Sequence, residues 1–158
     1  MLFGYFFLES KEKKKNIKIS EKFFKAKILS EKNQNQKAKI MLIEIINSKH
    51  KFYAPLSLNL IIDQKIISVE SEVESLFEKV LLIKKINKED INLIKIKKAL
   101  YLLNNSSEDK ILDILNPIVN SNSQWKPQAI ELLYEYFLNK GEKVKSQEYF
   151  QLLQAIKD

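Results

Sequence analysis

The sequence of 158 residues contains no cysteine and no arginine, and it has only two glycines and three prolines. Without cysteine, the chain can form no disulfide, no thiolate zinc site and no cysteine nucleophile. So few glycines and prolines suit an all-helical protein and argue against a β-sandwich, which needs many turns. With Gly4 and Gly141 as the only glycines, a glycine-rich phosphate-binding loop is also excluded.

The basic residues are all lysines, 27 in number, and the formal net charge is +7. A basic chain invites a nucleic-acid interpretation. Lysine, however, lacks the guanidinium fork with which arginine recognises phosphate and guanine in a bidentate manner. Lysine, isoleucine and asparagine are all abundant, as an AT-rich coding sequence would produce. We therefore favour compositional bias as the source of the charge and rank nucleic acid below protein as a partner.

The hydrophobic residues make up 45% of the chain, which is enough to build a core. The length fits one domain or one short repeat array. The clearest pattern lies in residues 124–157, which read as two amphipathic helices joined at Gly141. Pro127 suits the first turn of the first helix, and Gly141 suits the left-handed conformation at its end. The predicted apolar faces are Ile130, Leu133, Tyr134 and Phe137 in the first helix, and Val144, Phe150, Leu153 and Ile156 in the second.

Weaker versions of this helix pair recur upstream. The anchor positions of the second helices are Ala38, Val73, Ile111 and Ser146, which are 35, 38 and 35 residues apart. This spacing is close to the tetratricopeptide period of about 34 residues. The sequence therefore predicts an all-α, tetratricopeptide-like α-solenoid of about eight helices in four antiparallel pairs, whose stacking builds the core.

The pattern also predicts where the earlier helices begin and which residues they bury. Ser20, Ser68 and Ser107 are the expected N-terminal caps, with the first of these helices at 21–30. The second helices should bury Ala38, Leu42 and Ile45, then Val73, Phe77 and Val80, then Ile111, Leu115 and Ile118. The first helices of pairs two and three should bury Tyr53, Leu56, Ser57 and Leu60, and Ile96, Ala99, Leu100 and Leu103.

The N-terminal segment differs from the rest of the chain, so we divide the sequence into residues 1–18 and a repeat domain at 19–158. An apolar run is followed here by the charged run Glu9–Lys15. Eight residues are too few to cross a bilayer, which takes about 20. The run is interpreted as the end of a membrane helix, as an interfacial anchor, or as a segment folded onto the domain. The expected membrane-proximal residues are Leu2, Phe3, Tyr5, Phe6, Phe7 and Leu8.

Few residues offer catalytic chemistry. His50 is the only histidine, lies between Lys49 and Lys51, and is interpreted as a solvent-facing linker residue. Trp125 is expected to be an aromatic wedge between repeats, with a peptide anchor as the alternative. We find no Ser/His/Asp set, so we predict no catalytic residue, no enzymatic activity, no metal, no cofactor and no small-molecule substrate.

Residues 111–153 carry a more specific signal, ILDILNPIVNSNSQWKPQAIELLYEYFLNKGEKVKSQEYFQLL. A leucine-rich helix, a polar loop, Trp125 with Lys126, and the small residue Ala129 follow one another. This run resembles a bacterial tetratricopeptide-like family that includes the ancillary subunit of the Sec translocon. The resemblance implies an N-terminal membrane helix and a periplasmic repeat domain with a chaperone-like role. The run Glu9–Lys15 would then lie outside the membrane, against the positive-inside tendency.

We therefore expect a non-enzymatic protein-binding module at the bacterial inner membrane, facing the periplasm, with translocon or envelope proteins as partners. The first helix of each pair is expected to line the binding face. The candidate protein-binding residues are Lys27, Asn59, Lys97, Glu131, Glu135 and Leu138. The alternative is a soluble, cytoplasmic helical protein that binds RNA or acidic partners through its lysines.

Overall fold

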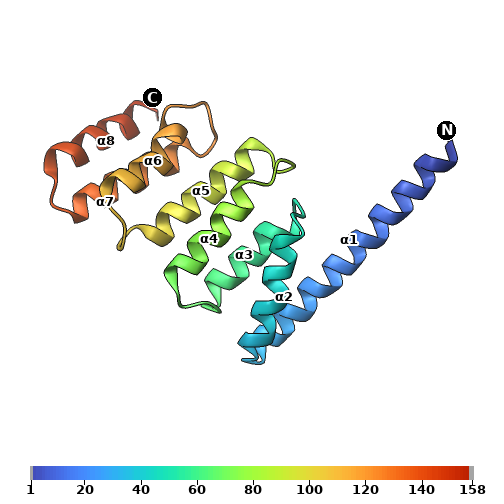
Figure 1. Cartoon of the computed structure of the whole chain (residues 1–158). Helices are drawn as coiled ribbons and strands as arrows, with labels where there is room; N and C mark the ends of the chain where they lie inside the picture. Colours follow the sequence, from blue (N-terminus) through green and yellow to red (C-terminus); the bar gives the residue numbers. More distant parts are fainter. Residues whose placement is uncertain (1, 157–158) are drawn as a thin grey trace. The chain divides into compact units, whose positions relative to one another are not determined.

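The computed structural model describes residues 2–156, with side chains from residue 12 onward. Within this range the chain folds into eight α-helices and contains no strand, which confirms the predicted all-α class. Figure 1 shows the helices in chain order, and their bounds follow. They are α1 (Leu2–Glu31), α2 (Asn35–Asn47), α3 (Tyr53–Asp63), α4 (Glu70–Leu81), α5 (Lys88–Leu102), α6 (Glu108–Val119), α7 (Lys126–Asn139) and α8 (Lys143–Ala155).

The chain divides into two compact units, Met1–Lys85 and Ile86–Asp158. In the first unit each helix contacts the next one, and α1 also contacts α3 while α2 contacts α4. In the second unit consecutive helices again contact each other, and α5 also contacts α7. Each unit therefore builds its core from neighbouring helices in the sequence.

Helix α1 is longer than the sequence pattern indicated. It runs without a break from Leu2 to Glu31, so the cap predicted at Ser20 and the helix start at residue 21 are wrong. The charged run Glu9–Lys15 consists mainly of lysine and glutamate, which have good helix propensity, and neither glycine nor proline interrupts it. The boundary drawn between residues 18 and 19 falls inside this helix.

The predicted turns and caps are correct at three places and wrong at one more. Gly141 has a φ of 74°, in the left-handed region, and Pro127 lies in the first turn of α7. Ser107 caps α6, with its Oγ accepting from the backbone N–H of Lys110 at 3.4 Å. Ser68 is not a cap, because α4 begins at Glu70 and its N-cap position is Val69, whose side chain cannot accept a hydrogen bond.

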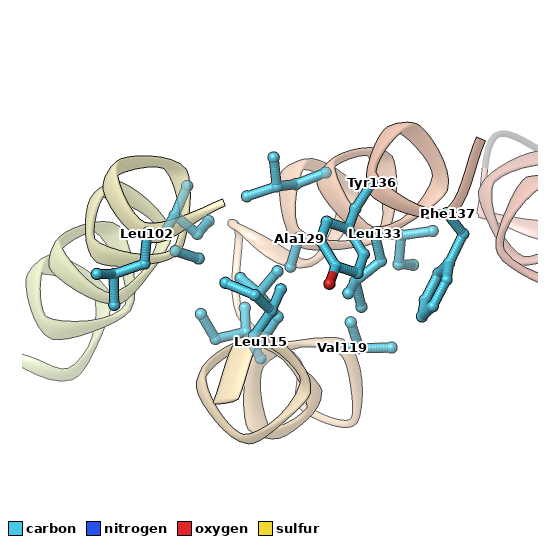
Figure 2. Packing of buried hydrophobic residues seen from close by; sticks show 13 residues of the cluster. Leu102, Leu115, Val119, Ala129, Leu133, Tyr136 and Phe137 are labelled. Atoms are coloured by element: carbon cyan, nitrogen blue, oxygen red, sulfur yellow. The ribbon is translucent and has the colours of Figure 1, made fainter. Parts of the chain in front are cut away.

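The second unit has a well-packed core drawn from α5, α6 and α7 (Figure 2). The labelled members Leu102, Leu115, Ala129 and Leu133 are completely buried, and Phe137 is 1% exposed. Phe137 continues the core toward α8, where its ring stacks on Tyr149 at a centroid distance of 5.5 Å. These contacts fix α6, α7 and α8 against one another.

The predicted buried faces are confirmed for α2, α4 and α6, and all four anchor residues are buried. In α8 the prediction is correct for Ser146 and Leu153, which face the core, and wrong for Val144, Phe150 and Ile156, which are exposed. Val144 is 74% exposed, and Tyr149 faces the core in addition. Helix α8 packs mainly against α7, so the apolar residues on its other faces stay in solvent.

Helices α3 and α5 also bury a face that is rotated from the predicted one. In α3 the buried residues are Ala54, Ser57, Leu58 and Ile61, so Ser57 is correct and Leu56 is only half-buried. In α5 Ile96 and Ala99 are buried as predicted, whereas Leu100 is exposed. Leucine and isoleucine occupy almost every turn of these helices, so apolar spacing alone does not select one face.

Among the described residues, no helix combines the length and the apolar composition that crossing a membrane requires. Helix α1 has 30 residues, but the charged run Glu9–Lys15 interrupts its apolar character.

Candidate functional site

Two adjoining cavities in the first unit bring together lysines from separate segments of the chain. One, of about 560 Å³, lies among α1, the α2–α3 connection and Lys85. The other, of about 490 Å³, lies between α1 and α2, and the two share Lys15, Ile19 and Ser48. We call the pair the lysine cavity. Its charged lining residues are Glu12, Lys14, Lys15, Lys18, Lys22, Glu44, Lys49, Lys51 and Lys85.

The lysines of α1 reach the cavity because of their spacing. Lys14, Lys18 and Lys22 lie at i, i+4 and i+8, which places them on one edge of the helix. Ile19, on the neighbouring face, is buried. The flexible stems of the lysines can cover apolar surface while the ammonium groups stay in water. The edge of α1 next to its buried face is therefore a row of positive charge.

His50 organises the opposite wall. Its Nδ1 accepts from the backbone N–H groups of Phe52 and Tyr53, at 3.2 and 3.1 Å, at the start of α3. Nε2 therefore carries the proton and donates to Oδ1 of Asn16 at 3.2 Å, which ties α3 to α1. His50 lies in the α2–α3 connection, as predicted for a linker residue, but it is half-buried and not fully open to solvent.

The surroundings of His50 disfavour its charged form. Burial lowers the pKa of the imidazole below 6.5, and the nearby charges of Lys15, Lys51 and Lys85 lower it further. His50 is consequently neutral at pH 7. Its role in this arrangement is to hold α1 and α3 together at the edge of the lysine cavity.

An aromatic cluster continues from His50 across the first unit. Tyr53 lies 5.2 Å from His50, 5.6 Å from Phe23 and 5.2 Å from Phe52, measured between ring centroids. Phe24 contacts Phe23 edge-on at 5.8 Å. Phe23 is buried, whereas Phe24 and Phe52 are more than half exposed.

The exposed face of α1 carries a second feature, which we call the apolar stripe. Ile17, Phe24 and Ile28 are 49%, 56% and 51% exposed. Their spacing of seven and four residues aligns them on one side of the helix. The buried residues Ile19, Phe23 and Ala26 lie on the other side. The lysine row Lys14, Lys18 and Lys22 runs between the two faces.

The protein-binding residues predicted from the sequence are distributed over both units. Lys27 on α1 is exposed and Asn59 on α3 is half-buried, and both belong to the first unit. In the second unit Lys97 on α5 is half-buried, and Glu131, Glu135 and Leu138 are exposed. These three share one side of α7 at i, i+4 and i+7. The side chains of the membrane-proximal set at residues 2–8 lie outside the described ones.

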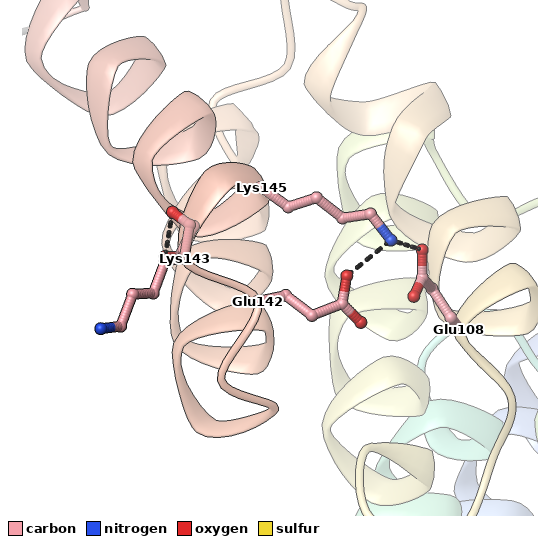
Figure 3. A network of polar contacts seen from close by, with 5 residues as sticks. Glu108, Glu142, Lys143 and Lys145 are labelled. Carbon is pink, nitrogen blue, oxygen red and sulfur yellow. Dashed lines mark hydrogen bonds and ion pairs between the residues drawn. The ribbon is translucent and has the colours of Figure 1, made fainter.

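The polar network of the second unit is structural. Lys145 of α8 forms ion pairs with Glu108 of α6 at 2.6 Å and with Glu142 at 2.7 Å (Figure 3). The hydrogen bonds that the Lys145 ammonium donates to these carboxylates raise the pKa of Lys145. Its ammonium also lies 5.0 Å from the ring centre of Phe137. Because Lys145 pairs with a carboxylate of α6 and with one just before α8, this network joins α6 to α8.

Two further positions tie the second unit together. Glu89 accepts from Ser123 Oγ at 2.7 Å and from the backbone N–H of Gln124 at 3.1 Å, which fixes the connection before α7. Trp125 packs against the core cluster of the second unit. Within residues 12–156, no cluster of three or more metal-ligating side chains is present.

Sequence reasoning missed the lysine cavity. The lysines of α1 and the run Lys49–Lys51 were each visible, but as a linker charge run and an isolated loop. The i, i+4, i+8 spacing of Lys14, Lys18 and Lys22 was the available signal for the first wall. The approach of the α2–α3 connection to α1 depends on tertiary packing.

No protein-family model, curated protein or solved structure matches this chain. The resemblance to a tetratricopeptide-like family therefore stays a prediction.

Proposed function

We propose that this chain is a non-enzymatic, tetratricopeptide-like α-solenoid that binds another protein through the exposed side of α1. The solenoid arrangement is supported by the contacts of α1 with α3, α2 with α4, and α5 with α7. Each of these joins corresponding helices of successive pairs, as in stacked helical repeats. The repeated spacing of the buried anchors Ala38, Val73, Ile111 and Ser146 supports the same arrangement.

The observation that carries the function is the apolar stripe. Three large side chains, each about half exposed, are aligned on one helix opposite its buried face. An exposed row of large apolar side chains on one helix face favours a binding site for a protein or a membrane. Ile17 and Ile28 offer aliphatic surface and no hydrogen bond, so they suit an apolar protein side chain better than a nucleic-acid base.

A capture experiment with matched variants tests this function. The purified chain is incubated with an extract of its source cells, and retained proteins are identified by mass spectrometry. Phe24→Ser combined with Ile28→Ser should abolish retention of at least one discrete protein. Leu82→Ser is the control, because Leu82 is 78% exposed in the same unit and lies outside the stripe. A set of retained proteins that is identical for all three chains would contradict the proposal.

Two further readouts decide what occupies the stripe. Light scattering of the wild type and the double variant measures self-association. A dimer of the wild type that the double variant does not form would overturn the proposal that the stripe binds a different protein. The expected membrane tether and periplasmic location stay predictions, and the identity of the partner tests them. Translocon or envelope proteins among the stripe-dependent partners would support that location, whereas cytosolic partners alone would contradict it.

A further inference from the structure

The lysine cavity has a large excess of positive charge. Seven lysines and two glutamates line it. Glu44 is held by Lys22 at 2.6 Å, and Glu12 lies 4.0 Å from Lys85. For Lys14, Lys15, Lys18, Lys49 and Lys51, no carboxylate lies within ion-pair distance among residues 12–156. Lysines on two walls therefore face a shared space with little compensating charge.

The polar lining between these lysines is ordered by hydrogen bonds. Asn16 accepts from His50 through Oδ1, so its amide NH₂ group stays available as a donor. Ser48 Oγ donates to the backbone carbonyl of Ile45 at 2.6 Å, so its hydroxyl hydrogen is not a donor for a ligand. The donors of the cavity are therefore the Asn16 amide and the lysine ammonium groups of α1 and of the α2–α3 connection, which is the chemistry that binds carboxylates or phosphates.

The position of the cavity relative to the apolar stripe decides between these anions. Lys14 and Lys18 lie on α1 between the cavity and the line of Ile17, Phe24 and Ile28. One ligand can therefore contact the lysines and the apolar side chains on adjoining faces of one helix. An acidic protein segment offers carboxylates and aliphatic groups together, whereas a nucleic-acid strand offers phosphates and flat bases.

We infer that the lysine cavity binds the carboxylates of an acidic amphipathic segment whose apolar side chains pack on the stripe of α1. This inference rests on the proposed function and names the chemistry of the partner. The segment needs glutamate or aspartate on one side and leucine-like residues on the adjoining side. Its binding displaces water from the ammonium groups of Lys15, Lys49 and Lys51 and orders their side chains.

The direct test uses a synthetic probe, because the natural partner is not identified. A fluorescein-labelled helical peptide of leucine and glutamate is titrated with the full chain at 50 mM salt, and anisotropy gives the Kd. A peptide in which glutamine replaces every glutamate is the matched control. We expect the glutamate peptide to bind at least tenfold more tightly, a difference of about 1.4 kcal/mol.

Lysine variants localise the binding. The combination Lys15→Gln, Lys18→Gln and Lys51→Gln should raise the Kd of the glutamate peptide about tenfold or more. The combination Lys65→Gln, Lys126→Gln and Lys143→Gln removes the same net charge outside the cavity and should change the Kd less than threefold. Equal losses in the two triple variants would show that only the net charge matters, and would overturn the inference.

His50 provides a readout inside the cavity. It is the only histidine, so an untagged chain gives one set of imidazole signals in a proton NMR titration. Carboxylates bound among Lys15, Lys51 and Lys85 would offset the charges that lower the pKa of His50, and the pKa should rise. An unchanged His50 titration at saturating glutamate peptide would place the peptide elsewhere and contradict the inference.

The remaining outcomes separate this inference from the proposed function. Loss of peptide binding in Phe24→Ser/Ile28→Ser with no loss in the cavity triple variant would support a protein-binding stripe and overturn the acidic-segment inference. Insensitivity to both sets of variants would overturn both. Single-stranded RNA is titrated in parallel at about 150 mM salt, where phosphate-driven binding weakens steeply. Tighter binding of RNA than of the glutamate peptide there would make nucleic acid the occupant and overturn the inference.

Discussion

At the scale of single residues, His50 combines a structural role with sensitivity to pH. Its Nδ1 lone pair accepts the N–H groups of Phe52 and Tyr53, so protonation of that nitrogen removes both hydrogen bonds. Lysines on both cavity walls oppose the added charge. The same residue that joins α1 to α3 at neutral pH therefore weakens the first unit in acid.

This arrangement predicts a loss of stability as the pH falls. The pKa of His50 in the folded chain is lowered below 6.5, so the unfolded chain binds the proton more tightly. The contribution of His50 to the unfolding free energy should be fully present above pH 6.5. As the pH falls through 6.5 toward the folded pKa, the unfolding free energy should decrease by less than about 1.4 kcal/mol per pH unit. Urea unfolding followed by circular dichroism at pH 7.5 and 5.5 measures this change.

The variant His50→Asn is the control for this effect. Asparagine can still accept at the start of α3 but does not titrate, so the midpoint should depend less on pH between 7.5 and 5.5. A variant with the same pH dependence as the wild type would assign the effect to carboxylates and contradict the role of His50.

At the scale of helices, the sequence predicts the buried face well where the apolar residues are restricted to one side. Helices α4 and α6 have mainly charged or polar residues on the remaining side, and their predicted core residues are all buried. The predicted residues of α2 are also buried, although Ile40 on its opposite side is 52% exposed. In α1, α3 and α5 apolar residues surround the helix, and the face that packs is chosen by the neighbouring helices. Phe23 and Phe24 illustrate this, since adjacent phenylalanines in one helix end up buried and exposed.

Helix α1 also allows a prediction about its N-terminal part. Among residues 12–31, where the side chains of α1 are described, the buried residues are Ile19, Phe23, Ala26 and Ser30. Deleting residues 1–10 should therefore change the melting temperature by less than about 2 °C, since a loss of 1 kcal/mol would shift it by roughly 4–8 °C in a unit of this size. Removing the apolar run should at the same time improve solubility. Differential scanning calorimetry and a precipitation assay measure the two effects.

A fall of several degrees in that deletion would show that residues 1–10 pack onto the first unit. The interpretation of these residues as a membrane anchor would then lose its main support, because an anchor must be free to leave the domain. Deletion of the same number of residues cannot be matched at α8, whose Tyr149 and Leu153 contact the core.

At the scale of the whole molecule, the eight helices and the period of their anchors could be predicted from spacing alone. The division after Lys85 could not, because it reflects which helices contact each other in space. The lysine cavity belongs to the same class of feature. Its walls come from α1, from residues 48–51 and from Lys85, which local periodicity does not connect.

The division into two units predicts that each unit unfolds independently of the other. The chain contains one natural probe for each unit. His50 is the only histidine and lies in the first unit, and Trp125 is the only tryptophan and lies in the second. Leu115 is completely buried in the second core. Replacing it by alanine removes buried methyl groups and leaves a cavity, which costs about 2–5 kcal/mol. Urea titrations followed by tryptophan fluorescence and by the imidazole signals of His50 report the two units separately.

We expect Leu115→Ala to lower the urea midpoint of Trp125 and to leave that of His50 unchanged, because each unit has its own core. The reciprocal variant Leu42→Ala, at a completely buried position of the first unit, should lower the midpoint of His50 alone. In a stack of helical repeats, stability is a sum of local contributions and neighbour contacts, so strong coupling would move both probes together. Equal shifts of the two midpoints in both variants would therefore show one cooperative folding unit and contradict the division.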